Sequence, residues 1–466
     1  MSSSSDLAAG AGGGAITGAG VHAPVLPRTR GVTIADIAIT LLLTSLIIDG
    51  FPAGAAVLRE FGARPANFLL LIAWGILLAR RIMRGRAMGV TVQESYLLVA
   101  ILVGAPLLNL PIALMQSPVG AREALTDWMK QFLMLGWGVT SYCIWKRVVA
   151  GMHPRRYCAL MALSAVLPVL AFIPDYFDHS GPVTAVLDLF RLGRNGRASS
   201  FATEPSIYGA WVAIIWPLVL FYTMRGGHAL GRLAGRALLV AAFLTALISN
   251  ARTFAVVLML QLVYGCYWSI QKQRGWGSRV RSLLLALCIT VAAATALASR
   301  LMTTTDLVRN ESDITRIGDT VTGINVSVAH PLVGVGIGEF GNFFAQYAPD
   351  FALRSIEVQN FIAGEAEYRA STFNMFVRLC VEFGIPLGIA FTLLILRPVV
   401  RAPKLALNEP FVLYAALSAV GGIGFWLSQD QYGYQPGILS IAVLSMTLSG
   451  AMQTTGRGGT PTARGR

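Results

Sequence analysis

Charged residues are scarce in this 466-residue chain, since Asp, Glu, Lys and Arg together make up 13% of it. Soluble domains carry about 25%, so the composition excludes an ordinary soluble domain. Histidine and cysteine are also few, at 5 residues each. The cysteines stand in or beside apolar runs and form no Cys-x-x-Cys pair: Cys143, Cys158, Cys266, Cys288 and Cys380. They are best interpreted as small core residues, so we expect no disulfide framework, no metal site and no cofactor.

Long apolar runs are what the chain has instead. Hydrophobic residues make up 55% of it, and the mean hydropathy is +0.62. Apolar runs of roughly 17 to 22 residues alternate with Arg-rich or Gly/Pro-containing breaks, which is typical of helices that cross a membrane. The sequence therefore predicts an all-α polytopic membrane protein with about 12 transmembrane helices. The expected spans are 33–50, 66–80, 95–115, 128–145, 157–174, 205–223, 237–250, 253–270, 282–299, 372–396, 410–428 and 436–452.

The net charge of +14 has a simple explanation in a membrane protein. With twelve spans, most Lys and Arg residues fall in short loops on the side of the N-terminus, and cytoplasmic loops of membrane proteins have this bias. We therefore expect both termini in the cytoplasm and no nucleic-acid partner. Residues 1–30 are rich in Ser, Gly and Ala and predict a disordered tail, and residues 453–466 predict a basic cytoplasmic tail.

Two long loops are expected on the opposite, outer face, at about 175–204 and 300–371. The second loop contains the sequence HPLVGVGIGEF at 330–340. Its glycines, Gly334, Gly336 and Gly338, do not indicate a dinucleotide site, because neither a preceding strand nor a βαβ unit is expected. Two interpretations stay open, namely a turn where the backbone closely approaches a ligand or a neighbouring helix, and simple helix-end caps.

Every cation expected on the outer face is an arginine. The guanidinium offers a planar fork of donors that suits phosphate oxygens. Arg191, Arg194 and Arg197 form a cluster in the first loop, and Arg252 stands in a tight turn at 249–253. Contact with lipid headgroups, or a general preference for arginine in this chain, explains these residues equally well.

One further polar pattern opens the expected span at 372–396. Asn374, Arg378 and Glu382 follow one another at four-residue steps, so they lie along one helix face. We interpret Arg378 and Glu382 as a structural ion pair, because pairing lowers the cost of burying either charge. This face should point into the protein.

Four motifs in this order resemble the bacterial O-antigen ligase and O-antigen or exopolysaccharide polymerase (Wzy-type) family. They are EPSIYG at 204–209, SNART at 249–253, HPLVGVGIGEF at 330–340 and FNMFVRLCVEFGIPLG at 373–388. The resemblance covers roughly residues 200–390. It implies a metal-independent glycosyltransferase of the bacterial inner membrane, which moves glycan from polyprenyl pyrophosphate to a sugar hydroxyl at the outer face. It also implies contact with membrane lipid, a flippase and a chain-length regulator as partners.

The resemblance and the chemistry of the reaction together suggest site residues. A pyrophosphate leaving group needs fixed cations, for which Arg316 and Arg252 come first and the three-arginine cluster second. Glu339, Glu204 and Asp430 are the candidates for a base or orienting group on the acceptor hydroxyl. The remaining candidates for substrate binding are Gly334, Gly336, Gly338 and Asn374.

The chain departs from the family at one position. Ligase members often have His before the Asn of the fourth motif, where this chain has Phe373. This difference favours a polymerase of repeat units over a ligase that transfers finished glycan to lipid A core. A multi-span transporter is the alternative of another class, and a non-catalytic assembly partner is a further one. A transporter should show matched halves or charges at the midplane of the bilayer, whereas here the polar residues concentrate in one loop.

Overall fold

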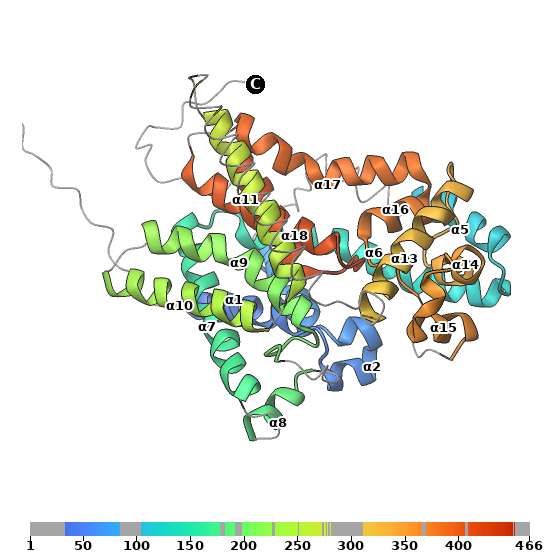
Figure 1. Ribbon diagram of the computed structural model, residues 1–466. Coiled ribbons are helices and arrows are strands. Elements are labelled where there is room, and N and C mark those ends of the chain that lie inside the picture. Colours follow the sequence, from blue (N-terminus) through green and yellow to red (C-terminus); the bar gives the residue numbers. More distant parts are fainter. Residues whose placement is uncertain are drawn as a thin grey trace, which may run out of the picture.

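All described elements of the protein are helices in the computed structural model (Figure 1). The structure describes residues 33–83, 104–177, 182–191, 198–225, 229–249, 251–272, 275, 277, 280, 311–365, 370–405, 409–450 and 452. Several predictions therefore lie outside the described residues: both tails, the span at 282–299 and the first part of the span at 95–115. The helical prediction is confirmed for the described residues.

Many of the described helices begin at a proline, which is favoured in the first helical turn. In the first part of the chain they are α1 (Ile34–Thr44), η1 (Ser45–Ile47), α2 (Pro52–Gly62), α3 (Pro65–Met83), α5 (Ala105–Gln116), α6 (Ala121–Val149), α7 (Pro154–Phe177), α8 (Pro182–Asp188) and α9 (Pro205–Arg225). The rest are α10 (Ala229–Ile248), α11 (Arg252–Lys272), α13 (Glu311–Ala329), α14 (Phe340–Tyr347), η3 (Ala352–Arg354), α15 (Ile356–Ala363), α16 (Met375–Phe383), α17 (Ile385–Leu405), α18 (Pro410–Trp426) and α19 (Gln435–Leu448).

Five described helices are long and apolar enough to cross a membrane, namely α7, α9, α10, α11 and α17. The helices at Ile34–Ile47 and Pro52–Leu58, bent by 81°, add a sixth if they are counted as one span. Several other expected spans coincide with shorter apolar helices, including α18 and α19. The structure thus agrees with a helical membrane protein, and the number of twelve spans stays a prediction.

The centre of the bundle is the antiparallel pair α18 and α19, which is buried almost throughout. α18 packs against α9 and α11, while α19 packs against α6. A Cβ atom on Gly422 would lie 2.8 Å from Gly437 Cα, so small residues allow the two backbones to approach closely. The buried Gln261 amide donates to the carbonyl oxygens of Ala213 at 2.7 Å and Leu417 at 2.8 Å, which joins three helices by polar contacts.

The prediction of one continuous span at 372–396 is wrong, because the chain breaks at Gly384 between α16 and α17. Gly384 has φ +80°, and a Cβ atom there would lie 2.4 Å from Leu332 O. Pro386 follows in the first turn of α17, a position that suits proline. The last carbonyls of α16 need partners outside the helix. Val335 N donates to Val381 O at 2.9 Å, and Gly336 N donates to Glu382 O at 3.3 Å.

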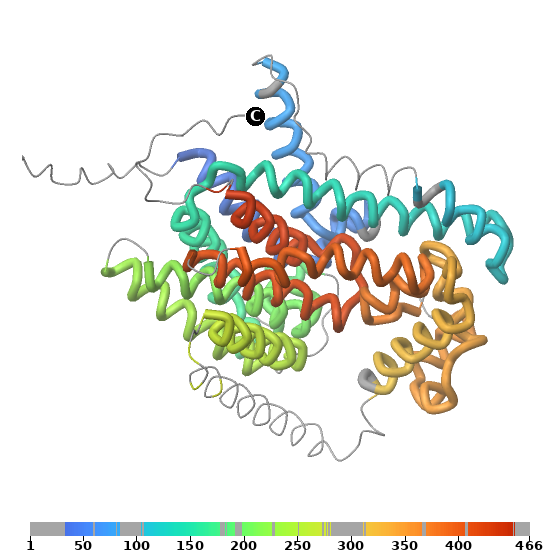
Figure 2. Tube along the Cα trace, turned by 90° about the horizontal axis from the view of Figure 1, so that it is seen from above, coloured from blue at the N-terminus to red at the C-terminus, as the bar shows by residue number. Residues whose placement is uncertain are grey.

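The outer loop is expected at 300–371, and its described part within residues 311–371, here called the 311–371 segment, contains α13, α14, η3 and α15. These helices lie at one end of the molecule, away from α7 and α10 (Figures 1 and 2). Their apolar side chains form a small core of their own: Val326, Val335, Phe340, Phe343, Phe344, Ala352, Val358 and Val381. Val381 belongs to α16, so this core extends onto the helix that leads into the bundle.

The residues Pro331–Glu339, here called the glycine loop, attach this segment to the bundle. The φ angles of Gly334, Gly336 and Gly338 are +71°, +103° and +82°. A Cβ atom on Gly336 would lie 2.6 Å from Ala113 Cβ of α5, and one on Gly338 would lie 2.8 Å from Asp127 O of α6. Of the two interpretations that the sequence leaves open, close approach of the backbone is confirmed, and the partners are neighbouring helices.

We expect Gly336→Ala to destabilise the protein by about 2–5 kcal/mol. Left-handed backbone strain accounts for about 1–2 kcal/mol, and overpacking against α5 accounts for about 1–3 kcal/mol. Gly364→Ala is the matched control, because Gly364 has φ +72° and nothing within 4 Å of an added Cβ. Denaturant titration in detergent measures both variants. Equal losses would contradict the proposed contact with α5.

Candidate functional site

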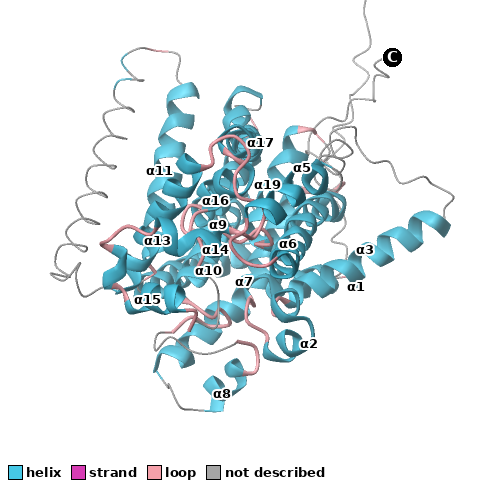
Figure 3. Ribbon diagram, turned by 90° about the vertical axis from the view of Figure 1, so that its right-hand side faces the viewer, coloured by secondary structure: helices cyan, strands magenta, loops and turns pink. Residues whose placement is uncertain are grey.

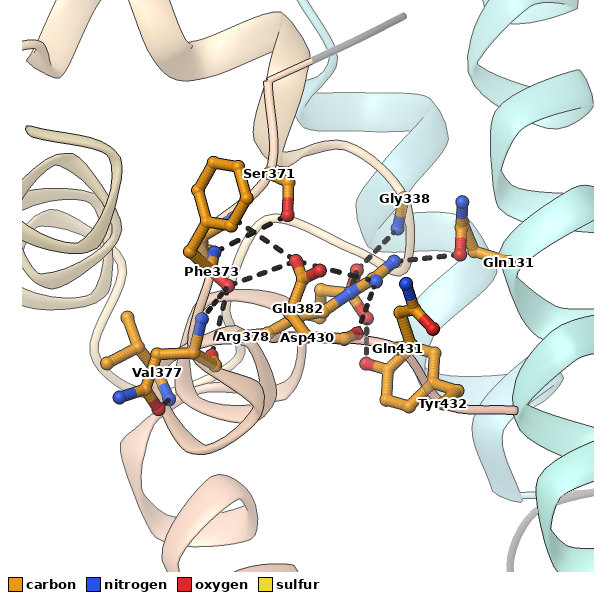
Figure 4. A network of polar contacts seen from close by, with 12 residues as sticks. Gln131, Gly338, Ser371, Phe373, Val377, Arg378, Glu382, Asp430, Gln431 and Tyr432 are labelled. Atoms are coloured by element: carbon orange, nitrogen blue, oxygen red, sulfur yellow. Dashed lines mark hydrogen bonds and ion pairs between the residues drawn. The ribbon is translucent and has the colours of Figure 1, made fainter. Parts of the chain in front are cut away.

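A largely buried guanidinium, that of Arg378, lies where the 311–371 segment meets the bundle. Arg378 Nε donates to Glu382 Oε1 at 2.9 Å, Nη1 donates to Asp430 O at 2.9 Å, and Nη2 donates to Gln131 Oε1 at 2.8 Å. The guanidinium carbon also lies 4.4 Å from the centroid of the Tyr432 ring. Figure 4 shows these side chains converging from α16, α6 and the turn between α18 and α19.

Glu382 completes this network from the opposite side. Its side chain is fully buried, Oε1 also accepts a hydrogen bond from Gly338 N at 3.0 Å, and Oε2 accepts one from the Tyr432 hydroxyl. The ion pair with Arg378 and its inward orientation are as predicted from the four-residue spacing. Asn374 caps α16, since its Oδ1 accepts from Phe376 N at 3.0 Å and Val377 N at 3.2 Å.

A strained turn lies between α13 and this network. Phe373 has φ +48°, a conformation that is unfavourable for a bulky residue and that occurs at functional sites. Neighbouring polar contacts hold the turn in place: Thr372 N donates to Asp430 Oδ2 at 3.1 Å, and Thr320 Oγ1 donates to Thr372 O at 2.9 Å. Phe373 stands at the position where the resemblance leads one to expect His.

Arg316 lies over this turn, with its guanidinium carbon 5.3 Å from the centroid of the Phe373 ring. Its Nη2 is 3.5 Å from Glu204 Oε2, and the two side chains are 31% and 36% exposed. The structure thus brings together two predicted site residues that are 112 positions apart in the sequence. An ion pair this exposed is worth about 0–1 kcal/mol, so an incoming anion can displace Glu204 at little cost.

Glu204 is positioned by the segment that precedes α9. Thr203 donates to the Asp49 carboxylate from its backbone N at 2.8 Å and from its hydroxyl at 2.7 Å. Ser206 Oγ donates to Glu204 Oε2 at 2.8 Å. Glu204 therefore already accepts a hydrogen bond on the oxygen that faces Arg316.

Arg252 begins α11 at the same end of α9. Its neighbour Ala251 packs against the first turn of α9, where a Cβ atom on Gly209 would lie 2.5 Å from Ala251 Cβ. The Arg252 side chain is half-buried. The predicted tight turn between two helices is confirmed, because α10 ends at Ile248 and α11 starts at Arg252.

Arg191, from the predicted arginine cluster, is fully engaged inside the protein. It donates to both carboxylate oxygens of Asp175 at 2.8 and 3.0 Å, to Asp188 at 2.9 Å and to Ser200 O at 2.9 Å. Its side chain has no exposed surface. This guanidinium stabilises the connection between α7 and α9, and we leave it out of the proposed site. Arg194 and Arg197 lie outside the described residues.

The other predicted residues have local contacts. Glu339 is fully buried where α14 begins and accepts a hydrogen bond from Asn342 Nδ2 at 2.8 Å. His330 precedes the glycine loop, and its Nε2 is 3.4 Å from the Tyr347 hydroxyl.

Asp319 is a candidate site residue that sequence reasoning missed. It is fully buried in α13, and neither carboxylate oxygen has a hydrogen-bond partner among the described residues. Burial, with Glu357 and Asp430 nearby, raises its pKa from 3.8 to about 8. Ser371 N is close enough to lower this pKa somewhat but does not reach hydrogen-bond geometry. The available signal in the sequence was that Asp319 is three positions from Arg316, since residues at this separation are neighbours on a helix surface.

No protein-family model matches this chain, and a search of curated proteins finds no match either. The family resemblance therefore depends on the four sequence motifs.

We expect Arg378→Met to destabilise the protein by about 3–5 kcal/mol, because it leaves the buried Glu382 carboxylate without its cation. Arg354→Met is the control, since Arg354 lies exposed in η3 and exposed substitutions usually change stability by less than about 0.5 kcal/mol. Denaturant titration in detergent compares the two. A loss below 1 kcal/mol for Arg378→Met would contradict a supporting role of the network.

Asp319→Asn should alter how stability depends on pH. A raised carboxyl pKa means that the folded state binds the proton more tightly. The wild-type carboxyl therefore does not lower the free energy of unfolding near pH 3, and it lowers this free energy increasingly as pH rises from about 4 to about 8. For a pKa raised from 3.8 to about 8, the full cost is roughly 6 kcal/mol at 1.36 kcal/mol per pKa unit. Because the amide does not titrate, the variant should gain stability relative to wild type across this pH range. A constant difference in melting temperature between pH 5 and 8 would contradict the raised pKa.

Proposed function

We propose that this protein polymerises lipid-linked polysaccharide repeat units of exopolysaccharide or O-antigen. It transfers glycan from polyprenyl pyrophosphate to the sugar hydroxyl of another lipid-linked unit. The observation that carries the proposal is Arg316, a half-exposed guanidinium that lies over the Phe373 ring and contacts Glu204 weakly.

The leaving group explains why this arginine matters. When the bond between the anomeric carbon and the pyrophosphate oxygen breaks, negative charge develops on the pyrophosphate. A fixed cation stabilises that charge most where water is largely excluded. Arg316 can offer its planar fork of donors to two phosphate oxygens, whereas Arg191 and Arg378 already donate to protein acceptors in several directions. Arg252, at the neighbouring end of α11, is proposed as a second cation for the same group.

The polymerase is favoured over a ligase because Phe373 occupies the position where ligase members often have His. The Phe373 ring contacts Arg316 and does not titrate, so this position supplies no base. We place the site at the outer face of the bacterial inner membrane, with both termini cytoplasmic, because the arginines and lysines are distributed in favour of that orientation. A flippase would supply the lipid-linked units, and a chain-length regulator would act beside the polymerase.

Arg316→Ala should abolish long polymer in a deletion strain complemented with the variant, with elongation falling by about 10²-fold or more. Arg252→Ala should reduce it in the same direction. Arg354→Ala, on the same segment, is the control and should support normal polymer. Glycan length on gels and protein level in membranes are the measurements.

The pattern of the residual glycan discriminates among the alternatives. Single repeat units still attached to the acceptor indicate a polymerase. Full-length polymer stranded on the carrier lipid indicates a ligase instead. If Arg316→Ala restores normal polymer at normal protein level, Arg316 does not bind the pyrophosphate. If the deletion leaves surface glycan unchanged, the proposed function is wrong.

A further inference from the structure

Asp319 is a buried ionisable group that has no role in the proposed binding of the pyrophosphate. Its carboxylate oxygens have no hydrogen-bond partner in the part of the chain that the structure describes. Burying a polar group without a partner is costly, and native proteins seldom keep such a group without a reason. By contrast, the buried acids Asp175 and Glu382 accept hydrogen bonds from an arginine and from backbone amides.

The position of Asp319 relates it directly to Arg316. The two residues are three positions apart on α13, so their Cβ atoms are about 5–6 Å apart on one side of the helix. Thr320, the next residue, is bonded to Thr372 O, and Ser371 N is near the Asp319 carboxylate. Asp319 therefore lies beneath the strained turn at 371–374, on whose Phe373 ring Arg316 rests.

Burial and the surrounding charges bring the pKa of this carboxyl close to neutral pH. Glu357 of α15 and Asp430 of the turn between α18 and α19 are the charged groups that raise its pKa, after burial itself. Arg316 is the cation on its own helix. A group with a pKa of about 8 is near the optimum for proton transfer at neutral pH.

We propose that Asp319 is the base that activates the acceptor, an inference that rests on the proposed polymerase function. The acceptor sugar hydroxyl forms a new bond from its oxygen to the anomeric carbon of the donor glycan. The bond from that carbon to the pyrophosphate oxygen breaks, and its electron pair leaves with the pyrophosphate beside Arg316. The hydroxyl proton passes to the Asp319 carboxylate. Because Asp319 is fully buried, this step requires the turn at 371–374 to move aside and admit the acceptor.

The other acids near this site are less suited to the task. Asp430 Oδ2 accepts from Thr372 N and lies 3.6 Å from Arg378 Nη1. Glu204 accepts from Ser206 and lies beside Arg316, where a leaving pyrophosphate would repel it. Glu339 accepts from Asn342 at the start of α14.

The test measures elongation by purified full-length protein in detergent from pH 6 to 9. The substrate is the lipid-linked glycan extracted from the deletion strain. The wild-type rate should rise with pH, reach half of its maximum near pH 8 and level off above that pH. Asp319→Asn should lose about 10²-fold or more although it folds at least as stably as wild type. Asp350→Asn, an exposed acid on the same segment, is the control and should retain the wild-type rate.

Glu357→Gln provides a second readout that a purely structural Asp319 would not affect. Removing this negative charge lowers the pKa of Asp319, so the midpoint of the pH profile should shift to lower pH. An Asp319→Asn variant with the wild-type rate, or a midpoint that Glu357→Gln leaves unchanged, would overturn the role of Asp319. Neither result would contradict the proposed polymerase function. If wild-type protein elongates no lipid-linked glycan, the proposed function itself fails.

Discussion

The largely buried guanidinium of Arg378 is the central contact between the polar segment and the helical bundle. Its three hydrogen bonds reach α6, the turn between α18 and α19, and Glu382 on its own helix. Glu382 in turn accepts from the glycine loop. Four parts of the chain therefore meet around one charge, as Figure 4 shows from close by. Figure 3 shows how the helices are arranged in the whole molecule. Burying most of that charge is tolerable because each of the three guanidinium nitrogens donates to an acceptor.

The network around Arg378 also supports the turn beside it. Thr372 connects the strained Phe373 turn to Asp430, which belongs to the same network. Beside this network, Arg316 contacts its counterion weakly and Asp319 has no hydrogen-bond partner among the described residues. Functional sites often keep such unfavourable arrangements. The two residues are three positions apart on α13. In our proposal Arg316 stabilises the departing pyrophosphate and Asp319 receives the acceptor proton.

The sequence predicts local features of this site better than long-range ones. The Arg378 and Glu382 pair follows from helical spacing, and the tight backbone approach of the glycine loop follows from its glycines. The break at Gly384 was missed because the apolar run continues across it, although Gly followed by Pro386 signals a helix boundary. Arg191 matched the expectation for a phosphate ligand, yet Asp175 and Asp188 engage it. Periodicity and motif cannot reveal such a partner, nor can they predict that Asp319 has none in the described structure.

The most direct test of the account is an experimental structure of the protein with bound polyprenyl pyrophosphate in a lipid nanodisc. We predict that the pyrophosphate lies within hydrogen-bond distance of the Arg316 guanidinium, with Glu204 displaced from its present position 3.5 Å away. Pyrophosphate bound elsewhere, with Arg316 still beside Glu204 and over the Phe373 ring, would contradict it.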